Sequence, residues 1–164
     1  MPSPSFIDTY FNAEKAESLL FVVVGLGAIA FGLYGIFKIK ESFYTGLAIP
    51  LVLIALIQLT VGSTVYLRTD KQAANLKALY QLDRATFKVQ EIPRMEMVNK
   101  NFDLYRYIEM GFVVTGLLLM TFLRERDFWL GVGVGMLMQG ALMLSLDIFA
   151  ERRADVYTEI VQQV

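Results

Sequence analysis

The sequence predicts an all-α membrane protein: four transmembrane helices in an antiparallel bundle, with cytoplasmic helical extensions of spans two, three and four. Residues 19–37, 43–67 and 128–146 contain no Asp, Glu, Lys or Arg, and a fourth uncharged run covers 110–123. At about 1.5 Å per residue, the three longer runs match the ~30 Å hydrocarbon core of a bilayer. The chain has 164 residues, which leaves room for one four-helix domain, residues 1–164.

The first predicted span, residues 19–37, is expected to remain as an anchor. It is longer than the core of a signal peptide, and Lys38 and Lys40 follow it instead of a small-residue cleavage site. A short connection then leads to the second predicted span, residues 43–67.

Residues 68–104 are predicted to form a helical hairpin outside the membrane. Residues 68–92 contain good helix formers, no Gly and no Pro, and their apolar side chains recur at helical spacing. We expect Pro93 to end the first arm, because proline lacks an amide donor and disfavours helix at the preceding residue. The second arm would then run back into the third span.

The third and fourth spans are predicted at residues 106–123 and 128–150. The uncharged run of the third span covers only ~21 Å, so its helix must reach back through Glu109 to cross the hydrocarbon core. Residues 151–164 continue the fourth span as an amphipathic helix. The alternative is that these extensions lie flat on the bilayer surface.

The distribution of basic residues predicts the orientation. Eleven of the fifteen Lys and Arg residues lie on the side of the long connection, and four lie on the side of the two short ones. The positive-inside rule therefore places both termini and the 68–104 hairpin in the cytoplasm. The architecture resembles that of many four-span bacterial proteins, which implies the bacterial inner membrane and carries no functional residues over.

Composition excludes several classes of site. The chain has no Cys and no His, which removes disulfides, thiol chemistry, Cys/His zinc sites, bis-histidine haem and Ser-His or Cys-His catalysis. A net charge of −1 gives no reason to expect nucleic acid as a partner. We therefore expect no catalytic residues, no metal and no cofactor.

Small residues mark the faces where the spans are expected to contact other helices. Helices in lipid associate through close backbone approach, so small residues three, four or seven positions apart indicate packing faces. The predicted helix-packing residues are Gly25, Ala28, Gly32 and Gly35 in the first span, Ala55 and Gly62 in the second, and Gly133 and Gly140 in the fourth. Packing within one chain and an oligomer interface both fit this pattern.

A polar layer is predicted near the cytoplasmic boundary. Asp147 lies seven residues after Gly140 and Glu109 lies seven before Gly116, so both carboxylates are expected to point into protein. The layer comprises Glu17, Arg68, Arg106, Glu109, Asp147 and Arg152. One interpretation is structural, with Glu109 and Asp147 in ion pairs with Arg106 or Arg152. The other is a site for a cation, a proton or an anionic headgroup.

Other polar and aromatic residues have two interpretations each. Gln58, Thr115 and Gln139 lie in mid-span, where they would either form hydrogen bonds between helices or line a narrow polar path. Tyr10 and Phe11 are among the aromatic residues predicted to form a belt at the membrane surface.

The expected function is that of a non-enzymatic integral membrane protein that acts through protein contacts in the membrane, as an accessory subunit, a regulator or an immunity-type protein. Its expected partners are membrane lipids and another membrane protein or a second copy of the chain. The alternative is a small oligomeric ion channel or transporter that uses its intramembrane carboxylates. A lipid-acting enzyme is the third hypothesis.

Overall fold

The computed structural model describes residues 4–164, which form long helices with no strand. The elements are α1 (Ser5–Tyr34), the π-helical turn η1 (Gly35–Ile39), α2 (Ser42–Leu82), α3 (Arg84–Phe122) and α4 (Asp127–Gln163). Each of the four long helices is long and apolar enough to cross a membrane. The predicted all-helical fold and its four candidate spans are confirmed.

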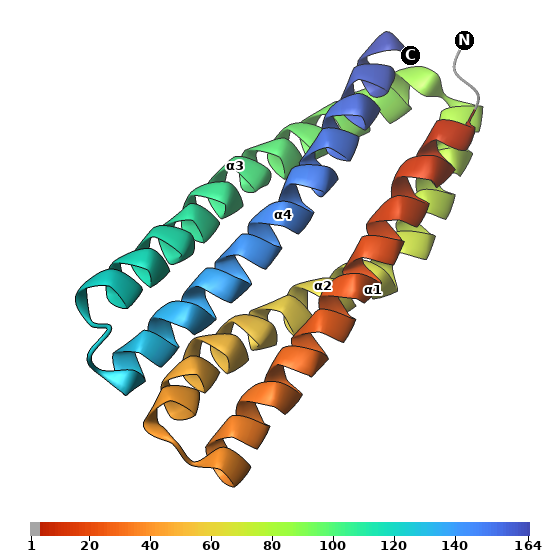
Figure 1. Ribbon diagram of the computed structural model, residues 1–164. Coiled ribbons are helices and arrows are strands. Elements are labelled where there is room, and N and C mark those ends of the chain that lie inside the picture. Colours follow the sequence, from red (N-terminus) through yellow and green to blue (C-terminus); the bar gives the residue numbers. More distant parts are fainter. Residues whose placement is uncertain (1–3) are drawn as a thin grey trace.

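The helices form two hairpins. α1 packs mainly against α2, and α3 packs mainly against α4, while α2 and α4 form the main contact between the hairpins. Figure 1 shows the start of α1, the end of α4 and the α2–α3 turn at one end of the molecule, with the α1–α2 and α3–α4 connections at the other. Half of the most apolar window of α2 is buried within the protein, against 11% of that of α3. α2 is therefore the central helix.

Within each hairpin the backbones approach closely at small residues. A Cβ atom placed on Gly62 of α2 would lie 2.8 Å from the carbonyl oxygen of Ser18 in α1. One placed on Gly133 of α4 would lie 2.9 Å from the carbonyl oxygen of Gly116 in α3. These separations leave no room for a side chain, so the small residues set how near the helices come.

The remaining predicted packing residues lie in several environments. Ala55 is fully buried, and Cβ atoms on Gly25 and Gly32 would lie within 3.2 Å of Leu59 and Val52 of α2. Those on Gly35 and Gly140 would approach Tyr44 and Phe112. Ala28 differs from these residues because it is half-buried and lines a groove.

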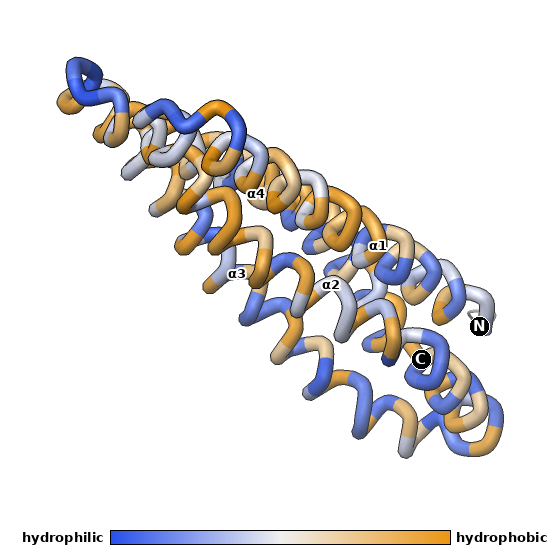
Figure 2. The backbone as a smooth tube through the Cα atoms, turned by 90° about the horizontal axis from the view of Figure 1, so that it is seen from below, coloured by the Kyte–Doolittle hydropathy of each residue, from blue (hydrophilic) through white to orange (hydrophobic). Residues whose placement is uncertain are grey.

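The end of the molecule that carries the termini has its own hydrophobic core, to which all four helices contribute. We call it the extension core, and it consists of Ile7, Tyr10, Phe11, Leu76, Tyr80, Phe87, Met95, Ala154, Tyr157 and Val161. Figure 2 shows hydrophilic and hydrophobic residues intermixed near the termini, as is typical of amphipathic helices with a shared core. The extensions therefore continue their spans as packed helices.

The prediction that Tyr10 and Phe11 form part of an interfacial belt is wrong. Tyr10 is 8% exposed and Phe11 is 1% exposed. The ring of Tyr10 stacks on Tyr157 with their centroids 4.3 Å apart. Because α1 begins at Ser5, its first turns extend along the other helices, and these rings are enclosed by protein.

The prediction that Pro93 ends the first arm of the hairpin is also wrong. The chain turns at Asp83, which has an extended backbone (φ −152°, ψ 102°), and Pro93 lies inside α3. The Asp83 carboxylate accepts hydrogen bonds from the backbone amides of Ala85 (2.9 Å) and Thr86 (3.3 Å), which satisfies donors that are otherwise unpaired at a helix start. The side chain of Thr86 lowers the pKa of this exposed carboxyl group by donating a hydrogen bond to it.

The position of Pro93 explains why α3 continues through it. Pro93 is exposed, and the carbonyl that loses its amide partner belongs to Val89, a residue that is 73% exposed. Glu91 and Met95 occupy the buried side of the same turns. The lost hydrogen bond therefore lies away from the core.

We expect Asp83→Ala to destabilise the protein by about 1 kcal/mol, because it removes the helix cap of α3. Equilibrium unfolding in mixed detergent micelles would measure the change. Gln81→Ala, at an exposed position two residues earlier, is the control and should be neutral. Equal stability of the two variants would contradict the capping role.

Candidate functional site

The polar layer lies where α1, α3 and α4 leave their most apolar segments, and two ion pairs hold it together. Arg106 of α3 donates to Glu151 of α4, and Arg153 of α4 donates to Glu17 of α1. Asp103 also approaches Arg106, with 3.7 Å between Oδ1 and Nη2. The layer therefore joins α4 to both α3 and α1.

The ion pairs expected for Glu109 and Asp147 are not the ones that form. Arg106 faces Glu151, and Arg152 is exposed. The reason is helix register: Arg106 lies about one turn beyond Glu109 on α3, and Glu151 lies about one turn beyond Asp147 on the oppositely directed α4. Arg106 therefore lies opposite Glu151 and not opposite Asp147.

Arg68 belongs to a separate contact between α1 and α2. Its Nη2 lies 3.9 Å from Oε1 of Glu14, and the hydroxyl of Thr69 donates to the same carboxylate at 3.5 Å. Burial raises the pKa of Glu14, while the charge of Arg68 acts in the opposite direction. Lys15 pairs with Asp70 on the exposed side at 2.5 Å.

Glu109 is the most unusual member of the layer. Its side chain is 1% exposed, and both carboxyl oxygens are buried without a hydrogen-bond partner among the described residues. The polar group that faces it is the carboxyl of Asp147, which lies within hydrogen-bonding reach on α4 and is itself half-buried. Two acceptors therefore meet with no donor between them.

Glu91, on the same helix, is equally buried and fully paired. Arg94 donates to its two oxygens at 2.7 and 2.6 Å, and the hydroxyl of Tyr157 donates at 2.8 Å. The guanidinium of Arg94 also lies over the ring of Phe11, 5.5 Å from its centroid. The sequence does not predict this arrangement when a helix break is expected at Pro93, because such a break would separate Glu91 from Arg94. Their spacing of three residues on one helix is the signal that identifies the pair.

Two of the three mid-span polar residues meet. Gln58 donates to Gln139 at 3.4 Å, and the amide of Gln139 donates to the carbonyl oxygen of Leu51 at 3.4 Å. Both glutamines are buried, whereas Thr115 is exposed on α3. The glutamines therefore link α4 to α2, and Thr115 does not extend them into a polar path.

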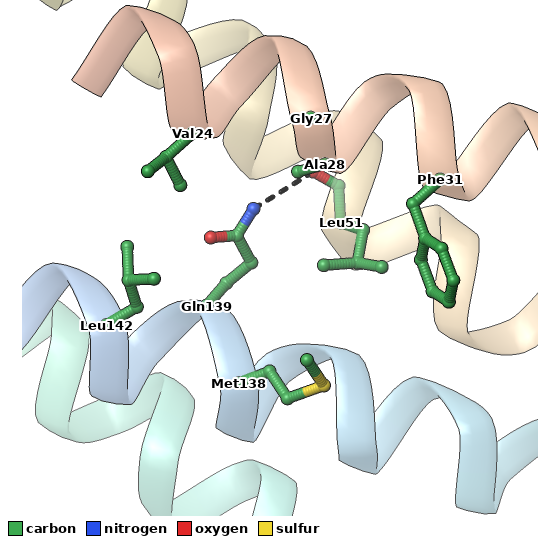
Figure 3. Close-up of a pocket in the computed structure, with 8 residues that line it drawn as sticks. All are labelled: Val24, Gly27, Ala28, Phe31, Leu51, Met138, Gln139 and Leu142. Carbon is green, nitrogen blue, oxygen red and sulfur yellow. Dashed lines mark hydrogen bonds between the residues drawn. The ribbon is translucent and has the colours of Figure 1, made fainter. Parts of the chain in front are cut away.

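A groove opens beside this glutamine pair, between α1 and α4 (Figure 3). Its cavity volume is about 250 Å³. It is lined by Val24, Gly27, Ala28, Phe31, Leu51, Met138, Gln139 and Leu142. Gln139 is its polar member, and the rest of the lining is apolar. Gly27 and Gly111 stand apart from the other glycines, because a Cβ on either would meet nothing within 4 Å.

Among residues 4–164 no group of three or more Asp or Glu side chains is placed to hold a metal ion. Comparison with known proteins finds no matching family, no similar curated protein and no similar solved structure. The polar layer and the groove are therefore the two candidate sites of this protein.

We expect Glu109→Gln to have a much smaller effect on stability than Glu91→Gln. Glu109→Gln should change the free energy of unfolding by less than about 1 kcal/mol, because Glu109 has no basic partner to lose and a neutral amide can occupy the same buried position beside Asp147. Glu91→Gln should destabilise by about 3 kcal/mol, since it leaves the guanidinium of Arg94 without its counter-charge. Equilibrium unfolding in detergent would measure both. Equal losses would contradict the difference in pairing.

Proposed function

We propose that this chain is a non-enzymatic integral membrane protein that acts by packing against a transmembrane helix of another membrane protein, as an accessory subunit, a regulator or an immunity-type protein. In this proposal the helices form an antiparallel bundle in a bacterial inner membrane, with both termini in the cytoplasm. The observation that carries it is Gly27, a glycine in the apolar part of α1 at which an added Cβ atom would meet no atom of a neighbouring helix within 4 Å.

Glycine inside a helix costs about 1 kcal/mol relative to alanine. Gly62 and Gly133 offset that cost by letting two backbones of the same chain approach closely. Gly27 has no such contact, and it lies in the groove between α1 and α4. A helix from another protein would use Gly27 as the internal helices use the other glycines.

The chemistry of the groove suits a transmembrane helix as its occupant. Val24, Phe31 and Leu142 offer an apolar surface, and Gln139 supplies an amide at its floor. The amide is already hydrogen-bonded to Leu51 and Gln58, so an apolar partner leaves no buried donor unpaired. The partner segment is therefore expected to be an apolar helix with small residues at its contact face.

A small channel or transporter is the second candidate, and the paired carboxyl groups of Glu109 and Asp147 favour it. The mid-span residues add no support, because Gln58 and Gln139 hydrogen-bond to each other and Thr115 faces outward. Flux measurements in proteoliposomes with wild type and Asp147→Asn would test this candidate. Equal flux in both, at the level of empty vesicles, would reject it.

We expect Gly27→Leu to abolish association with the partner while the protein stays folded, because the added side chain enters the groove and meets no atom of its own chain at Cβ. Affinity purification in mild detergent with mass spectrometry would measure association. Gly111→Leu, at the other uncontacted glycine, is the matched control and should retain the partner.

Gly32→Leu is the folding control for this experiment. Its Cβ would lie 2.9 Å from Cγ2 of Val52, so overpacking should destabilise the protein by about 1–3 kcal/mol. Unchanged co-purification with Gly27→Leu would contradict the proposal and would leave lipid as the occupant of the groove. Size-exclusion chromatography of the purified protein would reveal whether the partner is a second copy.

The orientation is tested separately with cysteines, which the natural chain lacks. Gln81 is exposed beside the α2–α3 turn and Arg126 is exposed directly before α4. Figure 1 shows the α2–α3 turn and the start of α4 at opposite ends of the helices. We expect an impermeant thiol reagent applied to intact cells to label Arg126→Cys and to spare Gln81→Cys, because eleven of the fifteen basic residues lie on the side of Gln81. The reverse pattern would overturn the orientation.

A further inference from the structure

We propose that Glu109 and Asp147 form a proton-binding site inside the membrane domain, in which the two carboxyl groups share a proton at neutral pH. The proposal is independent of the docking function above. It rests on three observations: the burial of Glu109, the identity of the group that faces it, and the balance of charges in the surrounding layer.

The first observation is an unpartnered and buried carboxyl group. Glu109 is 1% exposed, and neither of its oxygens has a hydrogen-bond partner among the described residues. Transfer of an ionised carboxylate from water to such a position is very unfavourable without a compensating partner. The neutral acid avoids most of that cost.

The second observation is that a proton completes the contact. Asp147 lies within hydrogen-bonding reach of Glu109, but two ionised carboxylates have no donor to share. A proton on either group converts the contact into an O–H···O hydrogen bond and satisfies one buried oxygen on each residue. Paired carboxyl groups in enzymes retain a proton for the same reason.

The third observation is the balance of charges around the pair. Two other carboxylates lie near Asp147, namely Glu151 on α4 and Glu17 on α1. Arg106 neutralises Glu151, and Arg153 neutralises Glu17. On α2, Arg68 faces Glu14. No guanidinium or ammonium group therefore remains for Glu109 and Asp147 among the partners that the described residues show, and Arg152 is exposed.

The chemistry favours a proton over a metal cation. No third carboxyl group joins the pair in a metal-binding arrangement within residues 4–164, so the six or more oxygen ligands that Ca²⁺ prefers are not at hand. Asp147 is half-buried, while Glu109 is enclosed, so Asp147 is the member of the pair nearer the protein surface. Proton exchange is therefore expected to pass through Asp147.

Infrared spectroscopy of the purified protein in lipid nanodiscs tests the site directly. At neutral pH the wild type should show the carbonyl stretching band of a protonated carboxylic acid, and Glu109→Gln should remove it. Asp147→Asn should keep and shift the band, because Glu109 then bonds to an amide. Glu91→Gln is the matched control: Glu91 is equally buried on the same helix but ion-paired, so the band should remain.

The pH dependence of thermal stability provides a second readout. The folded protein keeps a proton that the carboxyl groups of the unfolded chain lose above about pH 4–5, so the Tm of the wild type should fall as pH rises through neutral and should level off once the pair ionises. The Tm of Glu109→Gln should fall less over the same pH range, since its amide does not titrate and only other buried carboxyl groups such as Glu14 still contribute. The wild type should also melt at the same temperature in Na⁺ and in K⁺ at constant ionic strength.

Two results would overturn the proposal. One is a difference spectrum between wild type and Glu109→Gln that contains only ionised carboxylate bands at neutral pH. The other is a Tm that rises with Na⁺ or K⁺ in the wild type and not in Glu109→Gln, which would make a metal cation the occupant.

Discussion

Close backbone approach at small residues is the constraint on which the rest of this structure depends. In lipid there is little hydrophobic driving force for helices to associate, so the helices are held together mainly by van der Waals packing of backbones that approach closely. Gly62 against Ser18 joins α1 to α2, and Gly133 against Gly116 joins α4 to α3. Because a side chain at these positions would collide with a neighbouring backbone, the glycines determine how near each pair of helices comes and which side chains then meet across it.

The register of α3 on α4 determines the chemistry of the polar layer. Arg106 meets Glu151, and one turn further towards the α3–α4 connection Glu109 meets Asp147. Glu91 and Glu109 show how strongly the facing helix matters, since both lie on α3 and both are 1% exposed. Glu91 faces a guanidinium and a phenol, while Glu109 faces another carboxyl group. Two glutamates with the same burial therefore differ in role: Glu91 belongs to a structural ion pair, and Glu109 belongs to a candidate proton site.

The two ends of the helices are stabilised by different forces. Near the termini, aromatic and aliphatic side chains of all four helices form the extension core, where burial of apolar surface from water is the main stabilising term. Along the apolar segments this term is absent, and packing at small residues replaces it. α1 and α4 make only limited contact, and the groove between them leaves Gly27 available to another helix.

The sequence by itself determined the helical class, the four candidate spans and the polar character of the layer, because uncharged runs of sufficient length and helical periodicity are local properties of the chain. It did not locate the turn at Asp83, since the exposed position of Pro93 on α3 decides whether a proline is tolerated. Only the tertiary structure assigned partners to the charged residues. The sequence identifies a glutamate but does not show whether its side chain faces an arginine or an aspartate. The facing residue depends on helix register, which is set by backbone contacts between segments far apart in the chain.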